Sequence, residues 1–355
     1  PDGVRDAFSW RRSTDFEHIA AEVKAVRDSV GIIEISGFAK YSVTGPGAEA
    51  WLDRILASKI PAAGRMVLAP MLKHDGRLIG DFTLAKLGPE EFFIAGSGIA
   101  EDYHMRWFDQ HMAEDVTVTP HGAGMVGLSI AGPNARKVLQ KLTDADVSAA
   151  AFRFMDIRRM LLGMAPALVG RVTFTGDLGY EIWMKPEYQR HLFLALMDAG
   201  AEFGIRPFGL RALNALRLEK NFGGWAREYR PIYSPFEAEL GRFVALGKPA
   251  DFIGKTAAQA EKAKGGKLRL RSWVLEAGDA DVIGDEPIWH DGAVVGWVTS
   301  GGFAHGAQAS VAMGYVPKEL AETDGGWEVE LLGDRLPATL QRQPLFDANG
   351  SRMRA

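Results

Sequence analysis

The sequence predicts an α+β fold that ends in a small all-β domain. Three observations support this prediction: antiparallel hairpins outnumber strand-helix-strand crossovers, one strand-helix pattern occurs twice, and the composition changes near residues 261–272. With 355 residues and 47% hydrophobic content, the chain is long enough for two or three subdomains. We expect one region over residues 1–265 and a second over residues 266–355.

A short strand followed by Gly-Pro and an amphipathic helix occurs twice. YSVTGPGAEAWLDRIL spans residues 41–56, and GLSIAGPNARKVLQKL spans residues 127–142. The apolar residues of the first helix fall at helical spacing on one face: Ala48, Trp51, Leu52, Ile55 and Leu56. The repetition predicts two related α/β halves that pack together.

The segment between the two copies, residues 66–98, is typical of an antiparallel meander of three strands. Its turns are expected at residues 74–76 and 88–90, where Asp-Gly and Gly-Pro interrupt the apolar runs. Other expected elements are a helix over residues 99–111, strands within 152–184, and helices over 186–203 and 207–221.

The C-terminal region has the pattern of a small β domain. The charged Gly-Gly segment EKAKGGKLRLRS, residues 261–272, ends the helical part. Short strands with Asp-Gly, Gly-Gly and Gly-Asp turns follow it over residues 273–346. This pattern predicts a barrel or a sandwich.

Composition excludes several kinds of site. Basic and acidic residues number 41 and 45, a balance that argues against a nucleic-acid partner. The absence of cysteine excludes disulfides, thiol nucleophiles and cysteine-held metals, and the eight histidines lack ligand-like spacing, so we expect no metal site. No apolar run reaches the length of a membrane span, and the N-terminus lacks a signal-peptide core, so the expected location is cytoplasmic, without membrane contact. The missing initial Met fits either removal of that residue or excision from a longer polypeptide.

The strand GRLIGDFTLAK, residues 76–86, contains a charge where burial is expected. Asp81 stands between apolar residues on both faces of the pleat, and Thr83 shares its face. An ionised carboxylate buried without a partner costs several kcal/mol in practice. Asp81 therefore either has a structural partner or faces a wet cavity where its charge is used.

Two other stretches combine polar chemistry with glycine turns. In FTGDLGYEIWM, residues 174–184, Glu181 enters a strand after a tight turn, as a strand-edge residue or a ligand-binding group. In LRALNALRLEKNFGGW, residues 210–225, a helix stops at Gly-Gly before Trp225. That Trp is either a packing residue or an aromatic lid over a flat ligand.

Taken together, these blocks resemble the folate-binding family of the glycine-cleavage T-protein, or aminomethyltransferase. The similarity runs nearly end to end and is closest to the branch fused behind flavin domains in dimethylglycine and sarcosine dehydrogenases. It is carried by AVRDSVGIIEISGFAKYSVTGPGA, GRLIGDFTL, IAGPNARKVLQKL, FTGDLGYEIWM, ALNALRLEKNFGGW, SPFEAELGRFV with KPADFIGK, and TSGGFAHGAQASVAMGYVP. The order of the seven blocks is the family's order.

The resemblance implies a three-domain ring around tetrahydrofolate, with two related α/β subdomains in the folate-binding region and a C-terminal all-β barrel. It implies that Asp81 is catalytic and that Glu181 binds the amino-pyrimidine edge of the pterin. The other implied folate-binding residues are Thr83, Phe174, Tyr180 and Trp225. Three positions depart from the family pattern. The position of Phe174 is usually Tyr in the family, so stacking is kept and a hydroxyl contact is lost. The T-protein Asp-Asp pair is here Gly80-Asp81, and the Asn that commonly precedes Pro-Phe-Glu is Ser234.

The activity implied is tetrahydrofolate-dependent one-carbon transfer, with capture of a one-carbon unit from an N-methylated amine such as dimethylglycine or sarcosine as 5,10-methylenetetrahydrofolate. The chain has no flavin fingerprint, so oxidation of that amine falls to a partner domain or subunit. Two alternatives remain at this point. One is stand-alone methyl transfer from a sulfonium or aryl methyl ether to tetrahydrofolate, and the other is a folate-binding or docking domain without transfer chemistry.

Overall fold

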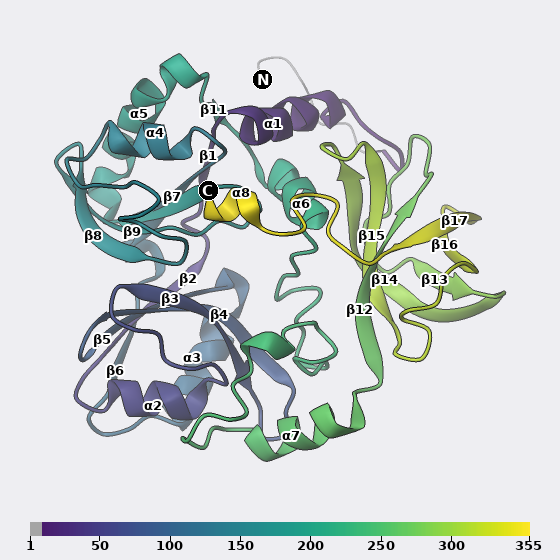
Figure 1. Cartoon of the computed structure of the whole chain (residues 1–355), viewed down its shortest axis with the longest axis horizontal. Coiled ribbons are helices and arrows are strands. Elements are labelled where there is room, and N and C mark those ends of the chain that lie inside the picture. Colours follow the sequence, from purple (N-terminus) through teal and green to yellow (C-terminus); the bar gives the residue numbers. More distant parts are fainter. Residues whose placement is uncertain (1–8) are drawn as a thin grey trace.

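The structure is a computed structural model that describes residues 9–355. Three lobes surround a central space: two α/β lobes lie on one side and a β-barrel lies on the other (Figure 1). The α+β class, the two related halves and the C-terminal barrel are therefore confirmed. Between the barrel and the sandwich that the sequence left open, the structure has the closed barrel.

The first lobe is a five-stranded sheet in the order β3-β4-β5-β2-β6, with α2 and α3 on one face. Its meander β3-β4-β5 is antiparallel, as predicted. Ile79, Phe82 and Leu84 of β4 pack in the core below the helices. The elements are β2 (Ala39–Thr44), α2 (Ala48–Ile55), β3 (Arg65–Leu72), β4 (Leu78–Gly88), β5 (Glu91–Gly96), α3 (Glu101–Gln110) and β6 (Thr117–Pro120).

The second lobe is a six-stranded sheet in the order β11-β1-β7-β10-β9-β8, with α4 and α5 packed on its outer face. The two predicted strand-helix units are β2 with α2 and β7 with α4, one in each sheet, so the repetition has a structural basis. The elements are β1 (Gly31–Glu34), β7 (Val126–Ala131), α4 (Ala135–Gln140), β8 (Ile157–Leu162), β9 (Ala165–Gly170), β10 (Gly179–Met184), α5 (Pro186–Ala199) and β11 (Arg206–Pro207).

The inner faces of the two sheets share one apolar cluster. Met66 and Phe93 come from the first sheet, and Ile157 and Trp183 come from the second. Helices α1 (Phe16–Asp28) and α6 (Leu210–Glu219) cover one end of this layer. Because strand residues alternate between faces, β4 and β10 each point every second side chain toward the space between the sheets.

The barrel is closed and antiparallel in the order β12-β15-β14-β13-β16-β17. Closure leaves it without an exposed sheet edge. Its strands are β12 (Leu268–Leu275), β13 (Pro287–His290), β14 (Ala293–Ala304), β15 (Ala309–Pro317), β16 (Trp327–Leu331) and β17 (Asp334–Gln341).

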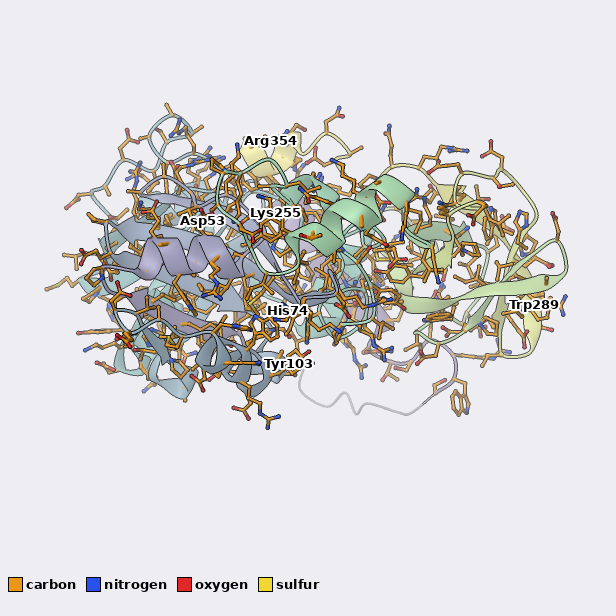
Figure 2. All side chains as sticks on the ribbon, turned by 90° about the horizontal axis from the view of Figure 1, so that it is seen from below. Asp53, His74, Tyr103, Lys255, Trp289 and Arg354 are labelled. Carbon is orange, nitrogen blue, oxygen red and sulfur yellow. The ribbon has the colours of Figure 1, made fainter. Side chains whose placement is uncertain are left out.

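Two segments connect the lobes. Helix α7 (Lys255–Lys264) runs from the first lobe to the barrel, and Figure 2 shows Lys255 near Asp53 of α2 while Trp289 marks the far end of the barrel. After β17 the chain leaves the barrel and ends in α8 (Ser351–Arg354) against the second lobe (Figure 1). The proposed division at residues 265 and 266 stays a prediction.

Short 3-10 turns complete the described elements: η1 (Gly98–Ala100), η2 (Gly122–Gly124), η3 (Ala201–Phe203) and η4 (Gly241–Phe243).

Candidate functional site

A cavity of about 1630 Å³ lies at the centre of the three lobes. Its walls come from the inner faces of β3, β4 and β10, the loops at residues 221–229 and 238–243, strand β12, and the C-terminal segment beyond β17. This volume exceeds the 300–1,000 Å³ typical of small-molecule sites. The cavity therefore has room for a ligand of several linked groups.

Asp81 reaches this cavity because of its place on β4. Its neighbour Phe82 points to the opposite face, into the core beneath α2 and α3. A Cβ at Gly80 would lie 2.4 Å from Cε2 of Phe82, so the glycine leaves room for that ring. Phe82 is thus fixed in the core, and Asp81 is fixed on the cavity side with Thr83.

The Asp81 carboxylate is only partly compensated. Its Oδ1 atom is buried and has no hydrogen-bond partner among the described residues. Burial and the nearby Glu228 carboxylate raise the pKa of Asp81 to about 7, against a smaller opposing effect of its own backbone N–H. A carboxyl group with a pKa near 7 can both take up and give up a proton at neutral pH.

Glu181 occupies the matching place on the other sheet. It lies on the central strand β10, opposite Ser129 of β7 and Gly170 of β9, and it lines the cavity. Burial alone raises the pKa of Glu181 to about 7. No side chain of residues 9–355 forms an ion pair with it, so the group is available to a ligand with hydrogen-bond donors.

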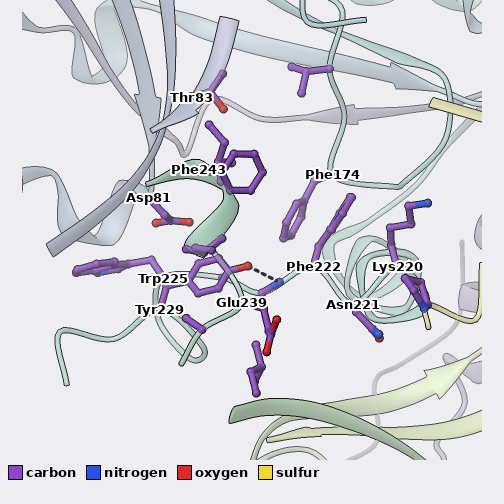
Figure 3. A pocket seen from close by; sticks show the side chains of 18 of the residues that line it. Asp81, Thr83, Phe174, Lys220, Asn221, Phe222, Trp225, Tyr229, Glu239 and Phe243 are labelled. Atoms are coloured by element: carbon purple, nitrogen blue, oxygen red, sulfur yellow. Dashed lines mark hydrogen bonds between the residues drawn. The ribbon is translucent and has the colours of Figure 1, made fainter. Parts of the chain in front are cut away.

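Aromatic side chains supply flat faces in the same cavity. Phe174 stacks on Phe222 with ring centroids 5.9 Å apart and an angle of 19° between the planes. Trp225 lies on the cavity wall near Asp81 (Figure 3). Its ring also contacts the ring of His104 at a centroid distance of 5.4 Å. Five of the six predicted site residues line the cavity: Asp81, Thr83, Phe174, Glu181 and Trp225.

Tyr180 is the exception. It precedes Glu181 on β10, and successive strand residues point to opposite faces. Its ring is fully buried in the core beneath α4 and α5, where it stacks on Phe152 at 5.7 Å. Tyr180 therefore packs the second lobe and does not line the cavity.

Residues that the sequence did not single out also line the site. The loop after α6 contributes Tyr229, whose hydroxyl oxygen accepts a hydrogen bond from Gly223 N at 3.2 Å. Glu228 holds this loop: it accepts hydrogen bonds from Gly224 N at 2.9 Å and Thr299 Oγ1 at 2.6 Å, and Arg217 lies 3.2 Å away. The contact with Thr299 joins this loop to barrel strand β14, 71 residues further along the chain, so no local pattern could reveal it.

Further cavity residues come from the segment at 238–243 and from the C-terminal segment: Glu239, Phe243, Pro344, Asn349 and Met353. The first segment lies within the block SPFEAELGRFV, which is part of the family resemblance, so that resemblance could have indicated these cavity residues. The second reaches the cavity through tertiary contacts alone.

The part of the chain that the structure covers contains neither a cluster of metal ligands nor a membrane-spanning helix. Residues 9–355 contain no group of three or more His, Asp or Glu side chains placed to hold a metal ion. Their helices are also too short or too polar to cross a bilayer. The predicted cytoplasmic location stays a prediction.

Two family descriptions match the chain. Residues 3–248 match the GCVT N-terminal domain, and residues 269–347 match the glycine cleavage T-protein C-terminal barrel domain. The first match alone covers more than half of the chain.

Individual relatives agree with these matches. The chain is 40% identical over 350 residues to "Dimethylglycine dehydrogenase, mitochondrial" from Homo sapiens, covering 98% of this chain and 40% of the relative. It is 30% identical over 311 residues to an aminomethyltransferase from Halothermothrix orenii, covering 86% of this chain and 85% of the relative. The chain thus spans about two fifths of the dehydrogenases that it matches.

A solved structure shares the fold. The glycine cleavage system aminomethyltransferase T from Bartonella henselae superimposes with a TM-score of 0.84 at 22% identity, covering 93% of this chain and 90% of that one.

Proposed function

The chain belongs to the glycine cleavage T-protein family, and from that membership and the cavity we propose that it transfers one-carbon units to tetrahydrofolate. The observation that carries the proposal is the pair of carboxylates, Asp81 and Glu181, exposed to one cavity from two facing sheets. Burial raises the pKa of each to about 7, and neither carboxylate has a cationic partner among the described residues. Such groups are costly unless a ligand uses them.

The residues present fit a reduced pterin. Its amino-pyrimidine edge presents adjacent N–H donors, which Glu181 would accept in a bidentate manner once ionised. The faces of Phe174 and Trp225 suit a flat ring, and Thr83 adds a polar contact beside Asp81. This arrangement assigns binding and orientation to Glu181 and the aromatic residues.

Asp81 is assigned the proton transfers. Tetrahydrofolate supplies two amine nitrogens that take up a one-carbon unit at the formaldehyde level. Each C–N bond that forms releases a proton, and Asp81 with a pKa of about 7 can accept it and pass it on. Its ionised form would also stabilise positive charge that develops on nitrogen.

We propose an N-methylated amine, such as dimethylglycine or sarcosine, as the source of the one-carbon unit. The name of the 40%-identical dehydrogenase supports this choice. The same comparison supports an oxidising partner domain, because the relative is more than twice as long as the matched region. In this proposal the partner oxidises the N-methyl group to an imine, water hydrolyses the imine to the demethylated amine and formaldehyde, and this chain captures the formaldehyde.

The test is a comparison of one-carbon donors in the presence of tetrahydrofolate. Formaldehyde should give 5,10-methylenetetrahydrofolate faster than the uncatalysed condensation does. Dimethylglycine should give it only when an oxidising partner is added. Product from a sulfonium or aryl methyl ether without a partner would instead support stand-alone methyl transfer, and folate binding without any acceleration would support a docking role.

A further inference from the structure

The hydroxyl group of Tyr229 has an unused donor at the cavity wall. Its oxygen accepts a hydrogen bond from Gly223 N at 3.2 Å. Among the described residues no acceptor contacts its proton, although the residue is buried, with 9% of its surface exposed. A buried hydroxyl ordinarily donates as well as accepts, so this proton is available to a ligand in the cavity.

The position of Tyr229 is set by tight packing. A Cβ at Gly223 would lie 2.6 Å from Cζ of Tyr229, so the ring rests directly on the glycine backbone. The next residue back, Glu228, is tied to Arg217 at 3.2 Å and to the barrel through Thr299 and Ser300 at 2.6 Å each. The loop that presents the hydroxyl is therefore anchored to α6 and to β14.

Asp81 offers the complementary group. Its buried Oδ1 has no hydrogen-bond donor, and both residues line the same cavity. Figure 3 shows the Tyr229 ring beside the Asp81 carboxylate, on the wall that also carries Trp225. An unused donor and an unused acceptor thus lie in one part of the site.

We propose that Tyr229 and Asp81 together form the site for the oxygen atom that leaves the one-carbon unit, and that Tyr229 is a further catalytic residue. The inference rests on the proposed function. A water molecule or hydroxyl group is the chemical class that suits the pair, because its oxygen accepts from Tyr229 and its proton is donated to Asp81.

The chemistry requires such a site. When formaldehyde condenses with two N–H groups, the two C–O bonds of its carbonyl are replaced by two C–N bonds, and the oxygen leaves as water with both N–H protons. No atom is oxidised or reduced. Asp81 relays the protons from nitrogen to oxygen, and the Tyr229 hydroxyl stabilises the partial negative charge on that oxygen as its bond to carbon breaks.

The surrounding charges keep Tyr229 in the donor form. Burial raises the pKa of Tyr229 above its usual value, and the Asp81 and Glu228 carboxylates raise it further, in excess of the lowering by Gly223 N–H and Arg217. The phenol is then protonated throughout the neutral range. It serves as a hydrogen-bond donor and not as a base.

The test replaces Tyr229 by Phe, which keeps the ring on Gly223 and removes the hydroxyl. Tyr233→Phe is the matched control, since Tyr233 is also buried, four residues away and outside the cavity lining. We expect kcat for the formaldehyde reaction to fall about 10- to 100-fold in Y229F, with the Kd for tetrahydrofolate unchanged within about two-fold. The control should match the unaltered chain in both.

A second measurement does not depend on activity. The carboxyl infrared band of Asp81, identified by difference against Asp81→Asn, is titrated in the ligand-free chain. We expect its midpoint to rise by about 0.5–1 pH unit in Y229F, because a water held by Tyr229 no longer stabilises the ionised form.

Three results would overturn the inference. These are an unchanged kcat in Y229F, a loss of kcat that matches a loss of tetrahydrofolate affinity, or an unmoved Asp81 titration. Failure of the unaltered chain to accelerate the reaction would instead overturn the proposed function, and this inference with it.

Discussion

The buried charges where α1, α6 and the C-terminal segment meet are paired, whereas the two carboxylates on the cavity wall are not. Arg27 lies 2.8 Å from Glu219 and 3.5 Å from Asp177, and Lys220 lies 3.3 Å from Asp347. Asp81 and Glu181, in the same protein, have no cationic partner among the described residues. The difference separates charges that join the lobes from charges kept for a ligand.

The contrast has an energetic reason. A buried ion pair recovers much of its desolvation cost through Coulomb attraction and hydrogen bonds, while a lone carboxylate recovers little. The lone group therefore takes up a proton more readily, and the pKa values of Asp81 and Glu181 rise to about 7. A ligand that brings hydrogen-bond donors or positive charge would offset the desolvation cost of the two ionised carboxylates.

The largest expected effect comes from removal of the cavity carboxylate at Asp81. Asp81→Ala should lower folate-dependent turnover by about 10²–10⁴-fold, the usual scale for a positioned acid-base group, and leave tetrahydrofolate binding largely intact. Steady-state rates and calorimetry on one preparation check this. An undiminished rate would remove Asp81 from the mechanism.

The paired region should respond in stability instead. Arg27→Ala leaves the buried Glu219 without a cation, while Asp177 keeps Arg352 at 2.9 Å, and we expect a loss of about 3–5 kcal/mol in the free energy of unfolding. Lys24→Ala on the same helix removes only the exposed pair with Asp28 and should cost less than about 1 kcal/mol. Equal losses in urea melts would contradict the distinction.

The pH dependence of folate affinity sharpens the comparison. The ligand needs ionised Glu181, whose pKa in the free protein is about 7, so affinity should fall as the pH drops below that value. Below the pKa the ionised fraction of Glu181 falls about tenfold per pH unit, so binding should be about 30-fold weaker at about pH 5.5 than at about pH 8. Glu181→Gln should flatten this dependence. An equally steep profile in that variant would mean that another group causes the pH dependence.

The smallest effect is a gain in stability. The pKa of Asp81 is about 7 in the native state instead of 3.8, so the native state binds a proton more tightly than the unfolded chain does. The stability that comes from this tighter proton binding is lost as the pH rises from about 4 to 7. Asp81→Asn should therefore be more stable than the unaltered chain by about 1–3 kcal/mol at about pH 8, with the gain shrinking toward about pH 4. Denaturant melts at several pH values check it; a gain independent of pH would contradict the cause given.

Local patterns predicted the elements and part of the site. Asp81 was found because a charge interrupts an apolar strand, and the meander and the barrel followed from turn residues and alternation. Alternation also explains why Tyr180 and Glu181 cannot face one ligand, a consequence that the family resemblance did not carry. The first helix, α1, was not among the predicted elements.

The remaining site depends on contacts between distant parts of the chain. Tyr229 is held through a glutamate that contacts the barrel about 70 residues further on, and the C-terminal segment docks on the second lobe through Arg352 and Asp177. No window of sequence contains both partners. The pairing of Arg27 with Glu219, 192 residues apart, could not be predicted for the same reason.

The most direct test of the account is calorimetry of this chain with tetrahydrofolate, repeated with Glu181→Ala. We predict binding by the unaltered chain and an affinity lower by about 2–4 kcal/mol in the variant, because the buried donors of the pterin lose a charged partner. Equal affinity in the two proteins, or no binding by either, would contradict the assignment of the cavity as a pterin site.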